Sequence, residues 1–296
     1  MNKLPLYLVL ALTGTACQPQ ATSTPTTAAT APAAQPVAVA LKTNGASTPG
    51  AAVAPGRLAL LRRYNVAPLL QSLTNDGDTA LQVQNGFFGP AGYRIEMALT
   101  RMQPTGQPGV FEVQGKSRYK KVITPFSGTI SITQVVEQPQ YSAQEIQEIA
   151  KAQEEGDLTK YLTEQNNQPD MYTAIGTFEL REDATQRGAG VYRGTVALDF
   201  RVEDGTVLQE SRTENTLTQG GAVKYAGTWT NNATGRVQPV VWVQEIINYR
   251  GPQVFKDFIV GSREIDFNPK YARLGWNTYW QNDEWWADAP KPTAAL

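Results

Sequence analysis

Residues 126–132 read Phe-Ser-Gly-Thr-Ile-Ser-Ile, an alternating stretch in which Gly128 shares the face of Phe126 and Ile130. The same Gly-Thr pattern returns at 174–180, 192–200 and 225–229. A period of two is typical of strands that are half buried. The glycines of this pattern, each on the apolar face of its own stretch, are Gly128, Gly176, Gly194 and Gly227.

A glycine on the inner face weakens a strand unless it permits a bend or a close approach of two backbones. Repeated inner-face glycines coil a sheet into a barrel or a strongly bent sandwich. An aromatic residue, Phe126, Tyr192 or Tyr225, stands two positions before three of these glycines and covers the gap. The spacing between the glycines is unequal, which excludes a solenoid or propeller repeat. We therefore predict an all-β fold, either an antiparallel barrel or a bent β-sandwich.

Other stretches add strands to this sheet. The stretch 93–100 alternates, with Ile95 and Met97 facing one way and Arg94 and Glu96 facing the other. Asp204-Gly205 between two apolar runs predicts a hairpin. The stretch 57–64 is either a helical turn or an entry strand. Short strands are also expected at 110–113, 207–211, 240–244, 254–260 and 264–267, which brings the total to about nine or ten.

One helical insertion interrupts the strands. Ser142 and Glu145 have the spacing of a capping box, and Ile146 and Ile149 follow on one stripe before Gly156. The segment either covers a barrel mouth as a lid or forms a solvated connection between two strands.

The composition excludes several classes of chemistry. Lys and Arg number 26 against 27 Asp and Glu, so no charge surplus indicates a nucleic-acid partner. The chain has no histidine, which excludes catalytic triads and zinc sites that depend on it. A single cysteine cannot form an internal disulfide. We assign no catalytic residue, metal site or cofactor.

The N-terminus has the pattern of an export signal. Lys3 precedes an apolar stretch at 4–16, which at about 13 residues is shorter than the roughly 20 of a transmembrane helix. The segment Leu12-Thr13-Gly14-Thr15-Ala16-Cys17 resembles the bacterial lipobox, whose usual form is Leu-Ala/Ser-Gly/Ala-Cys. Ala16 matches that form, whereas Gly14 stands where the family has Leu. The resemblance covers residues 1–17 only.

This resemblance implies that the signal peptide, residues 1–16, is removed and that Cys17 then carries acyl chains such as palmitate. More than one chain makes membrane anchoring stable. Gln18, rather than Asp, follows Cys17, which by the lipoprotein sorting rule implies the outer membrane or cell surface. The folded body is then expected in the periplasm or at the exterior. Simple secretion with an incidental cysteine is the alternative.

Residues 17–56 separate the anchor from the body. They are rich in Ala, Thr, Pro, Ser and Gln, with Lys42 as the only charge. Such a composition cannot bury enough apolar surface to fold, so we expect a disordered linker that holds the body off the membrane. The β-rich domain is expected at 57–288, and residues 289–296 are expected to be a disordered tail.

The C-terminal stretch 276–286 holds four of the six tryptophans. Its aromatic rings can stack on sugar faces while the neighbouring amides and carboxylates bind hydroxyls, or they can pin the segment to the barrel. We weigh the structural role as the stronger of the two. The candidate ligand-binding residues are Trp276, Tyr279, Trp280, Asn282, Asp283 and Trp285.

Paired carboxylates would be needed for glycosidase chemistry. Asp283 and Glu284 are adjacent and face apart on a strand, whereas Asp199 and Glu203 share a polar face with Arg201 between them. The latter set is typical of a solvated ladder of charges. The segment 75–78, Asn-Asp-Gly-Asp, predicts an Asx-type turn.

These observations favour a non-enzymatic binding or structural module of the cell envelope. Its partner is either an apolar small molecule held in the barrel or another envelope component. The alternative is a carboxylate-based hydrolase or a carbohydrate-binding protein that acts on envelope or extracellular glycans through the Trp-rich segment. A facing pair of acids in a cleft distinguishes the hydrolase from the binding module.

The lipid anchor predicts the behaviour of Cys17→Ser. Without the thiol no acyl chain can be attached, so the variant is expected in the soluble fraction while the wild type sediments with membranes. Mass spectrometry of the mature N-terminus measures the acyl mass directly. A Cys17→Ser protein that still sediments with membranes would contradict the anchor.

Overall fold

The computed structural model describes residues 55–74, 80–138, 141–153, 159–160, 163, 171–210, 216–261, 265–281 and 283–287. All of these belong to one compact unit of the chain. The predicted signal peptide, Cys17, the turn at 75–78, Asn282, most of the linker and the tail lie outside the described residues.

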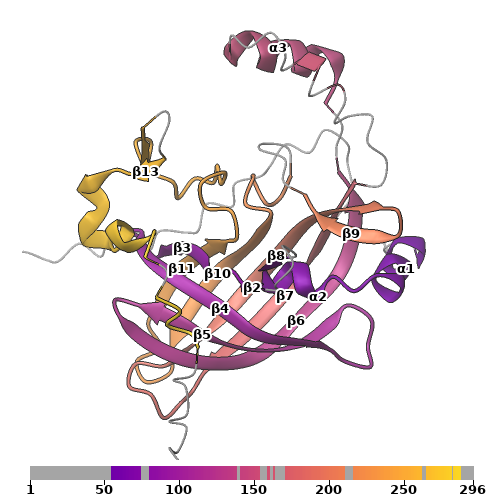
Figure 1. Ribbon diagram of the computed structural model, residues 1–296. Coiled ribbons are helices and arrows are strands. Elements are labelled where there is room, and N and C mark those ends of the chain that lie inside the picture. Colours follow the sequence, from indigo (N-terminus) through magenta and orange to yellow (C-terminus); the bar gives the residue numbers. More distant parts are fainter. Residues whose placement is uncertain are drawn as a thin grey trace, which may run out of the picture. The chain divides into compact units, whose positions relative to one another are not determined.

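The described chain is mostly antiparallel β-sheet (Figure 1). The strands are β1 Leu73–Thr74, β2 Ala80–Leu81, β3 Gln84–Phe88, β4 Tyr93–Pro104, β5 Val110–Tyr119, β6 Val122–Glu137, β7 Met171–Glu182, β8 Gly190–Glu203, β9 Thr206–Gln209, β10 Val223–Asn231, β11 Val237–Val243, β12 Ile259–Val260 and β13 Asp266–Phe267. The helices are α1 Pro55–Arg63, α2 Ala67–Gln71 and α3 Ala143–Gln153, followed by the 3-10 turns η1 Pro269–Leu274 and η2 Trp276–Thr278.

Nine of these strands form one sheet that closes into a ring, as Figure 1 shows. Its order is β10-β11-β3-β4-β5-β6-β7-β8-β9, and β10 also pairs with β8. The β8–β10 pairing closes eight of the strands into a ring. The ninth, β9, stays outside the ring and pairs only with the C-terminal end of β8. The predicted all-β antiparallel fold is confirmed, and the edge-to-edge pairing of β8 with β10 makes it the barrel rather than the bent sandwich of the two predicted alternatives.

The four Gly-Thr stretches fall in β6, β7, β8 and β10, and their glycines lie where strand backbones approach closely. Gly194 and Gly227 are direct partners across β8 and β10. A Cβ at Gly194 would lie 2.7 Å from the Gly227 Cα, and a Cβ at Gly227 would lie 2.6 Å from the Gly194 Cα. A Cβ at Gly128 or Gly176 would meet the neighbouring strand in the same way. The predicted close approach of strand backbones at these glycines is confirmed, and all four lie in the sheet that closes into a ring.

The interior of the ring is filled along most of its length by a hydrophobic cluster. Ile95, Met97 and Leu99 of β4 are fully buried there. Tyr225 and Trp242 stack at its centre, with ring centroids 5.0 Å apart and planes 11° apart. The buried Leu70 of α2 joins this cluster and accepts hydrogen bonds on its carbonyl from Gln84 Nε2 at 3.0 Å and Tyr225 OH at 3.2 Å. The helix α2 thus packs into the end of the barrel at which β3 and β10 begin.

A second hydrophobic cluster lies on the outer face of the barrel. Phe87, Val241 and Val243 point outward from β3 and β11 and are covered by the chain that follows β11. Trp276 and Phe258 of that chain are buried against Phe87, at centroid distances of 4.9 and 5.4 Å. The described part of the C-terminal segment, residues 246–261, 265–281 and 283–287, therefore packs on the barrel from outside.

Several strand predictions are confirmed and others need correction. Of the stretch 57–64, residues 57–63 are helical, in α1, and Asp204-Gly205 forms the β8–β9 turn with positive φ at both residues. Of the strand expected at 254–260 only β12 forms, and it pairs with β13 in a separate small sheet. The residues 254–258 pack their apolar side chains on the barrel instead of pairing.

The predicted capping box of the helical insertion is confirmed in α3. Ser142 Oγ accepts from the Glu145 N–H at 3.2 Å, and Glu145 Oε2 accepts from the Ser142 N–H at 2.7 Å. The backbone hydrogen bond from Ser142 lowers the pKa of the Glu145 carboxyl. This insertion leaves the barrel at the end of β6 and returns at the start of β7.

The close approach at Gly194 predicts a large effect of a single methyl group. Gly194→Ala is expected to lower the free energy of unfolding by about 2 kcal/mol, because the new Cβ overlaps the β10 backbone. Gly106→Ala is the matched control, since nothing lies within 4 Å of a Cβ there. Urea unfolding of both variants measures the difference, and equal stabilities would contradict the close approach.

Candidate functional site

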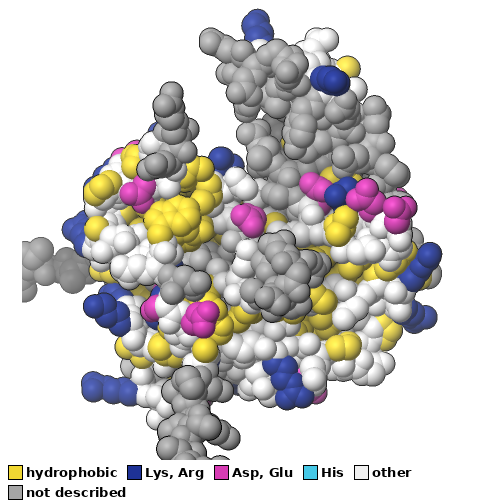
Figure 2. Space-filling view, in the orientation of Figure 1, with side chains coloured by type: hydrophobic (Ala, Val, Ile, Leu, Met, Phe, Trp, Pro, Cys, Tyr) yellow, Lys and Arg dark blue, Asp and Glu magenta, His cyan; other side chains and the backbone are white. Residues whose placement is uncertain are grey.

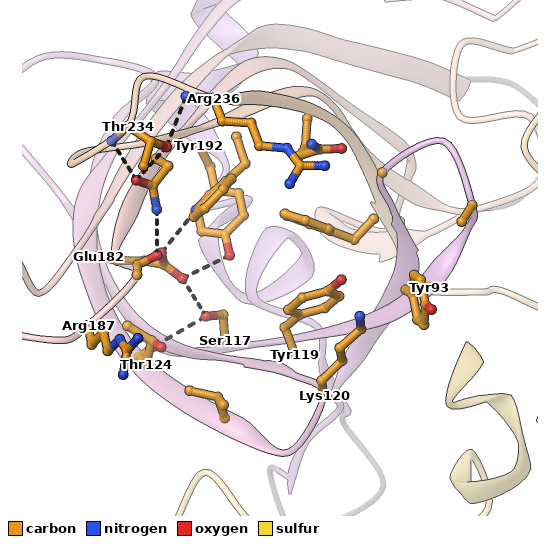
Figure 3. A pocket seen from close by; sticks show the side chains of 18 of the residues that line it. Tyr93, Ser117, Tyr119, Lys120, Thr124, Glu182, Arg187, Tyr192, Thr234 and Arg236 are labelled. Carbon is orange, nitrogen blue, oxygen red and sulfur yellow. Dashed lines mark hydrogen bonds between the residues drawn. The ribbon is translucent and has the colours of Figure 1, made fainter. Parts of the chain in front are cut away.

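A cavity of about 640 Å³ opens at one end of the barrel, among four hairpin turns (Figure 3). The turns join β3 to β4, β5 to β6, β7 to β8 and β10 to β11, and each contributes residues to the lining. We call this the mouth cavity. The helical insertion joins β6 to β7 at the other end of these strands, and none of its described residues lines the cavity.

Aromatic side chains form much of its wall. Phe88 of β3 lies between Tyr119 of β5 and Trp229 of β10, at centroid distances of 4.6 and 5.4 Å. Tyr93 contacts Tyr119 edge to face at 6.2 Å. Val122 adds an aliphatic surface and is 60% exposed. An apolar group that enters this cavity would meet rings on several sides.

The floor of the mouth cavity is organised around the buried carboxylate of Glu182, at the end of β7. Its Oε1 accepts from Ser117 Oγ and Tyr192 OH, both at 2.9 Å. Its Oε2 accepts from the Gly190 N–H at 2.8 Å and from Trp229 Nε1 at 3.0 Å. Figure 3 shows the hydroxyls of Ser117 and Tyr192 converging on Glu182. The carboxylate thus links β7, which carries it, to β5, β8 and β10. Each of its two oxygens accepts two hydrogen bonds.

The surroundings of Glu182 indicate a structural role. Burial, and then the neighbouring Glu182 charge, raise the pKa of the Tyr192 hydroxyl, so Tyr192 remains a hydrogen-bond donor. Glu182 is the only carboxylate that lines the cavity in the part of the chain that the structure describes. The facing pair of acids that a glycosidase requires is therefore not formed by the described residues at this mouth.

Cationic side chains stand at the rim. Lys120 lies in the turn between β5 and β6, Arg187 in the turn between β7 and β8, and Arg236 next to the turn between β10 and β11. The Lys120 ammonium lies 3.8 Å from the Tyr93 ring centroid and 5.3 Å from that of Tyr119. A cation over aromatic faces is stabilised by the ring quadrupoles.

The predicted C-terminal candidates lie elsewhere, over the outer face of the barrel. Trp276 is 1% exposed and donates from Nε1 to the Gly92 carbonyl at 3.2 Å. Tyr279 packs edge to face against Phe267, at 4.7 Å between centroids. Trp280 is 58% exposed and donates to Asp266 Oδ1 at 3.3 Å. The buried ring of Trp276 thus has a packing role, whereas a glycan-binding role of its neighbours stays a prediction.

An ionic network fixes the end of this segment to β4 and β5. Glu96 Oε1 accepts from Arg94 Nη2 at 2.8 Å, and Glu96 Oε2 accepts from Arg118 Nε at 2.6 Å. Arg118 also pairs with Asp283 and lies 4.9 Å from the Trp285 ring centroid. Burial lowers the pKa of Arg94. For Arg118 burial also acts to lower the pKa, but the hydrogen bonds and charges of Glu96 and Asp283 together raise it.

The outward surface of the C-terminal segment is partly apolar. Figure 2 shows hydrophobic side chains gathered where Figure 1 places β13. Trp280, Ile265 and Val260 are the large hydrophobic residues exposed there. This surface and the mouth cavity are separate, because none of the described residues beyond β11 lines the cavity.

The expectation of a solvated ladder at Asp199 and Glu203 is wrong for Asp199. That residue is fully buried and accepts from Thr173 Oγ1 and Thr218 Oγ1, both at 2.6 Å. Burial raises the pKa of the Asp199 carboxyl. The segment 216–222 covers this part of the outer face, which the alternation of β8 alone does not reveal.

Sequence reasoning did not identify the residues of the mouth cavity. Ser117, Glu182 and Trp229 are far apart in the chain, and only the closure of the barrel brings them together. The available signal was Lys120-Lys121 between two alternating stretches, which marks a hairpin tip with two basic residues.

No group of three or more His, Cys, Asp or Glu that could hold a metal ion occurs among the described residues. Within the same residues, the helices are too short or too polar to span a bilayer. No protein-family model, curated protein or solved structure matches the chain.

The four donors around Glu182 predict a contrast between two substitutions. Glu182→Ala is expected to lower the free energy of unfolding by about 3 kcal/mol, because it leaves buried N–H and O–H groups without an acceptor. Glu182→Gln is expected to cost only about 1 kcal/mol, because its carbonyl can face Gly190 and Trp229 while the two hydroxyls accept from its amide. Urea unfolding tests this order, and equal losses would contradict it.

Proposed function

We propose that this protein is a lipid-anchored module of the cell envelope that binds a small apolar molecule in the mouth cavity of its barrel. The observation that carries the proposal is the cavity itself. Its volume of about 640 Å³ lies within the range of about 300–1,000 Å³ that small-molecule sites occupy. Aromatic walls over a polar floor are the usual lining of such sites.

The rest of the barrel supports this choice of site. The interior is filled by its own side chains around Trp242, so a ligand has room at the mouth rather than along the whole axis. The closed ring holds the cavity walls on rigid strands, which favours a site formed before the ligand arrives.

The anchor is proposed from the sequence, on the lipobox that ends at Cys17. A membrane-bound module would meet apolar molecules of the envelope at a high local concentration. We place it at the outer membrane or cell surface, with the barrel in the periplasm or at the exterior.

The alternative of a glycan hydrolase receives less support. Glu182 already accepts four hydrogen bonds, so transferring a proton to a substrate would require it to lose established partners. The lining offers no second carboxylate among the described residues. A binding role needs no such group.

Binding of a neutral aromatic dye tests the proposal. The full chain with Cys17→Ser, free of acyl chains, is titrated with N-phenyl-1-naphthylamine and its fluorescence followed. We expect saturable binding at one site, and at least about tenfold weaker binding for Ala91→Trp, because Ala91 lines the mouth and a bulky ring occupies it.

Ala233→Trp is the matched control, since Ala233 is exposed on the β10–β11 turn but does not line the cavity. Its affinity should equal that of the parent chain. Native mass spectrometry of the protein purified from its own cells identifies any molecule that copurifies. A folded parent chain with no saturable dye binding would overturn the proposal.

A further inference from the structure

We infer that the ligand of the mouth cavity is an amphipathic anion, whose apolar part lies between the aromatic walls and whose anionic group is bound at the rim by Arg236 and Lys120. This inference rests on the proposed function and adds the chemical class of the ligand. It follows from the distribution of charge around the opening.

The lining carries an excess of positive charge. Its ionisable cations are Lys120, Arg187 and Arg236, against the single carboxylate of Glu182. Glu182 lies in the floor of the cavity, and its carboxylate accepts hydrogen bonds from four protein donors. None of the three cations forms an ion pair with a carboxylate of the described residues. Their charge at the opening is therefore available to an anion from outside.

Arg236 is held by a neutral partner. With the Gln238 amide turned so that its oxygen faces the guanidinium, that oxygen accepts from Arg236 Nε at 2.6 Å and from Nη2 at 3.1 Å. An amide orients the guanidinium without neutralising it. In Figure 3 the Arg236 side chain extends from the rim over the opening. The remaining N–H groups of a guanidinium match the oxygens of a carboxylate, sulfonate or phosphate.

Lys120 is held at the same opening by its backbone and by the aromatic rings. Lys120 and Lys121 both have positive φ, of 48° and 69°, in the two-residue turn between β5 and β6. This turn directs the Lys120 ammonium over Tyr93 and Tyr119 rather than away from the barrel (Figure 3). A cation fixed over the aromatic wall is well placed for the charged end of a ligand whose apolar body lies below it.

Two dyes with a related aromatic skeleton and different charge test the apolar site and the preference for an anion separately. The full chain with Cys17→Ser is titrated with 1-anilinonaphthalene-8-sulfonate, an anion, and with neutral N-phenyl-1-naphthylamine. We expect the anion to bind more tightly. Arg236→Gln should weaken binding of the anion about tenfold and leave the neutral dye unchanged, since it removes one charged hydrogen-bond partner.

Arg101→Gln is the matched control, because Arg101 also contacts a neutral glutamine, Gln103, at 2.8 Å but lies outside the mouth cavity. Its affinities should equal those of the parent chain. Lys120→Gln provides a second variant with the same expected selective loss. Circular dichroism of every variant verifies that the barrel is folded.

Equal affinities for the two dyes, with neither changed by Arg236→Gln or Lys120→Gln, would overturn the anionic ligand and leave the apolar site intact. Loss of saturable binding for both dyes in the folded parent chain would overturn the proposed function and the inference together. A selective loss of the anionic dye in both variants, with Arg101→Gln unchanged, supports the inference.

Discussion

The close approach of β8 and β10 at Gly194 and Gly227 is the contact on which the barrel depends. These residues face each other across the β8–β10 pairing, which turns the open sheet of the described strands into a ring. Two Cα atoms without side chains allow the strands to cross at a distance that a single methyl group would prevent. Without this contact β8 would keep β7 and β9 as its neighbours, and the edge formed by β10 would stay open.

The same pair of strands then forms one side of the mouth cavity. Tyr192 stands two residues before Gly194, and Trp229 stands two residues after Gly227, as direct partners in the register. Both side chains donate hydrogen bonds to Glu182. The carboxylate therefore connects β8 to β10 two residues away from the glycines. The close approach at the glycines and two donors in the polar floor of the cavity therefore belong to the same pair of strands.

The sequence contained enough to predict the central strands but not the site. Alternation with inner-face glycines identified β6, β7, β8 and β10, because the pattern reflects a local backbone constraint. It missed β3, since Gln84-Asn85-Gly86 has the composition of a turn, although Gly86 is an inner-face glycine opposite Trp242. The alternation of β8 also predicted that its outer face is exposed to solvent. Asp199 on that face is buried instead, because it is covered by a loop outside the strand, whose Thr218 donates to it. Sites built from several hairpin tips require the register of the whole ring.

The turn at Lys120-Lys121 joins the fold to the proposed chemistry. A two-residue hairpin turn with positive φ at both positions favours Asn-Gly or Asp-Gly, and Asp204-Gly205 in this same chain follows that preference. Two lysines in the same conformation carry a backbone strain on the order of 1 kcal/mol each. Glycine there would relax the turn but would remove the ammonium that lies over Tyr93 and Tyr119. The strained turn places the Lys120 ammonium at the mouth cavity. Such strain is expected where a residue is retained for its side chain rather than for the stability of the turn.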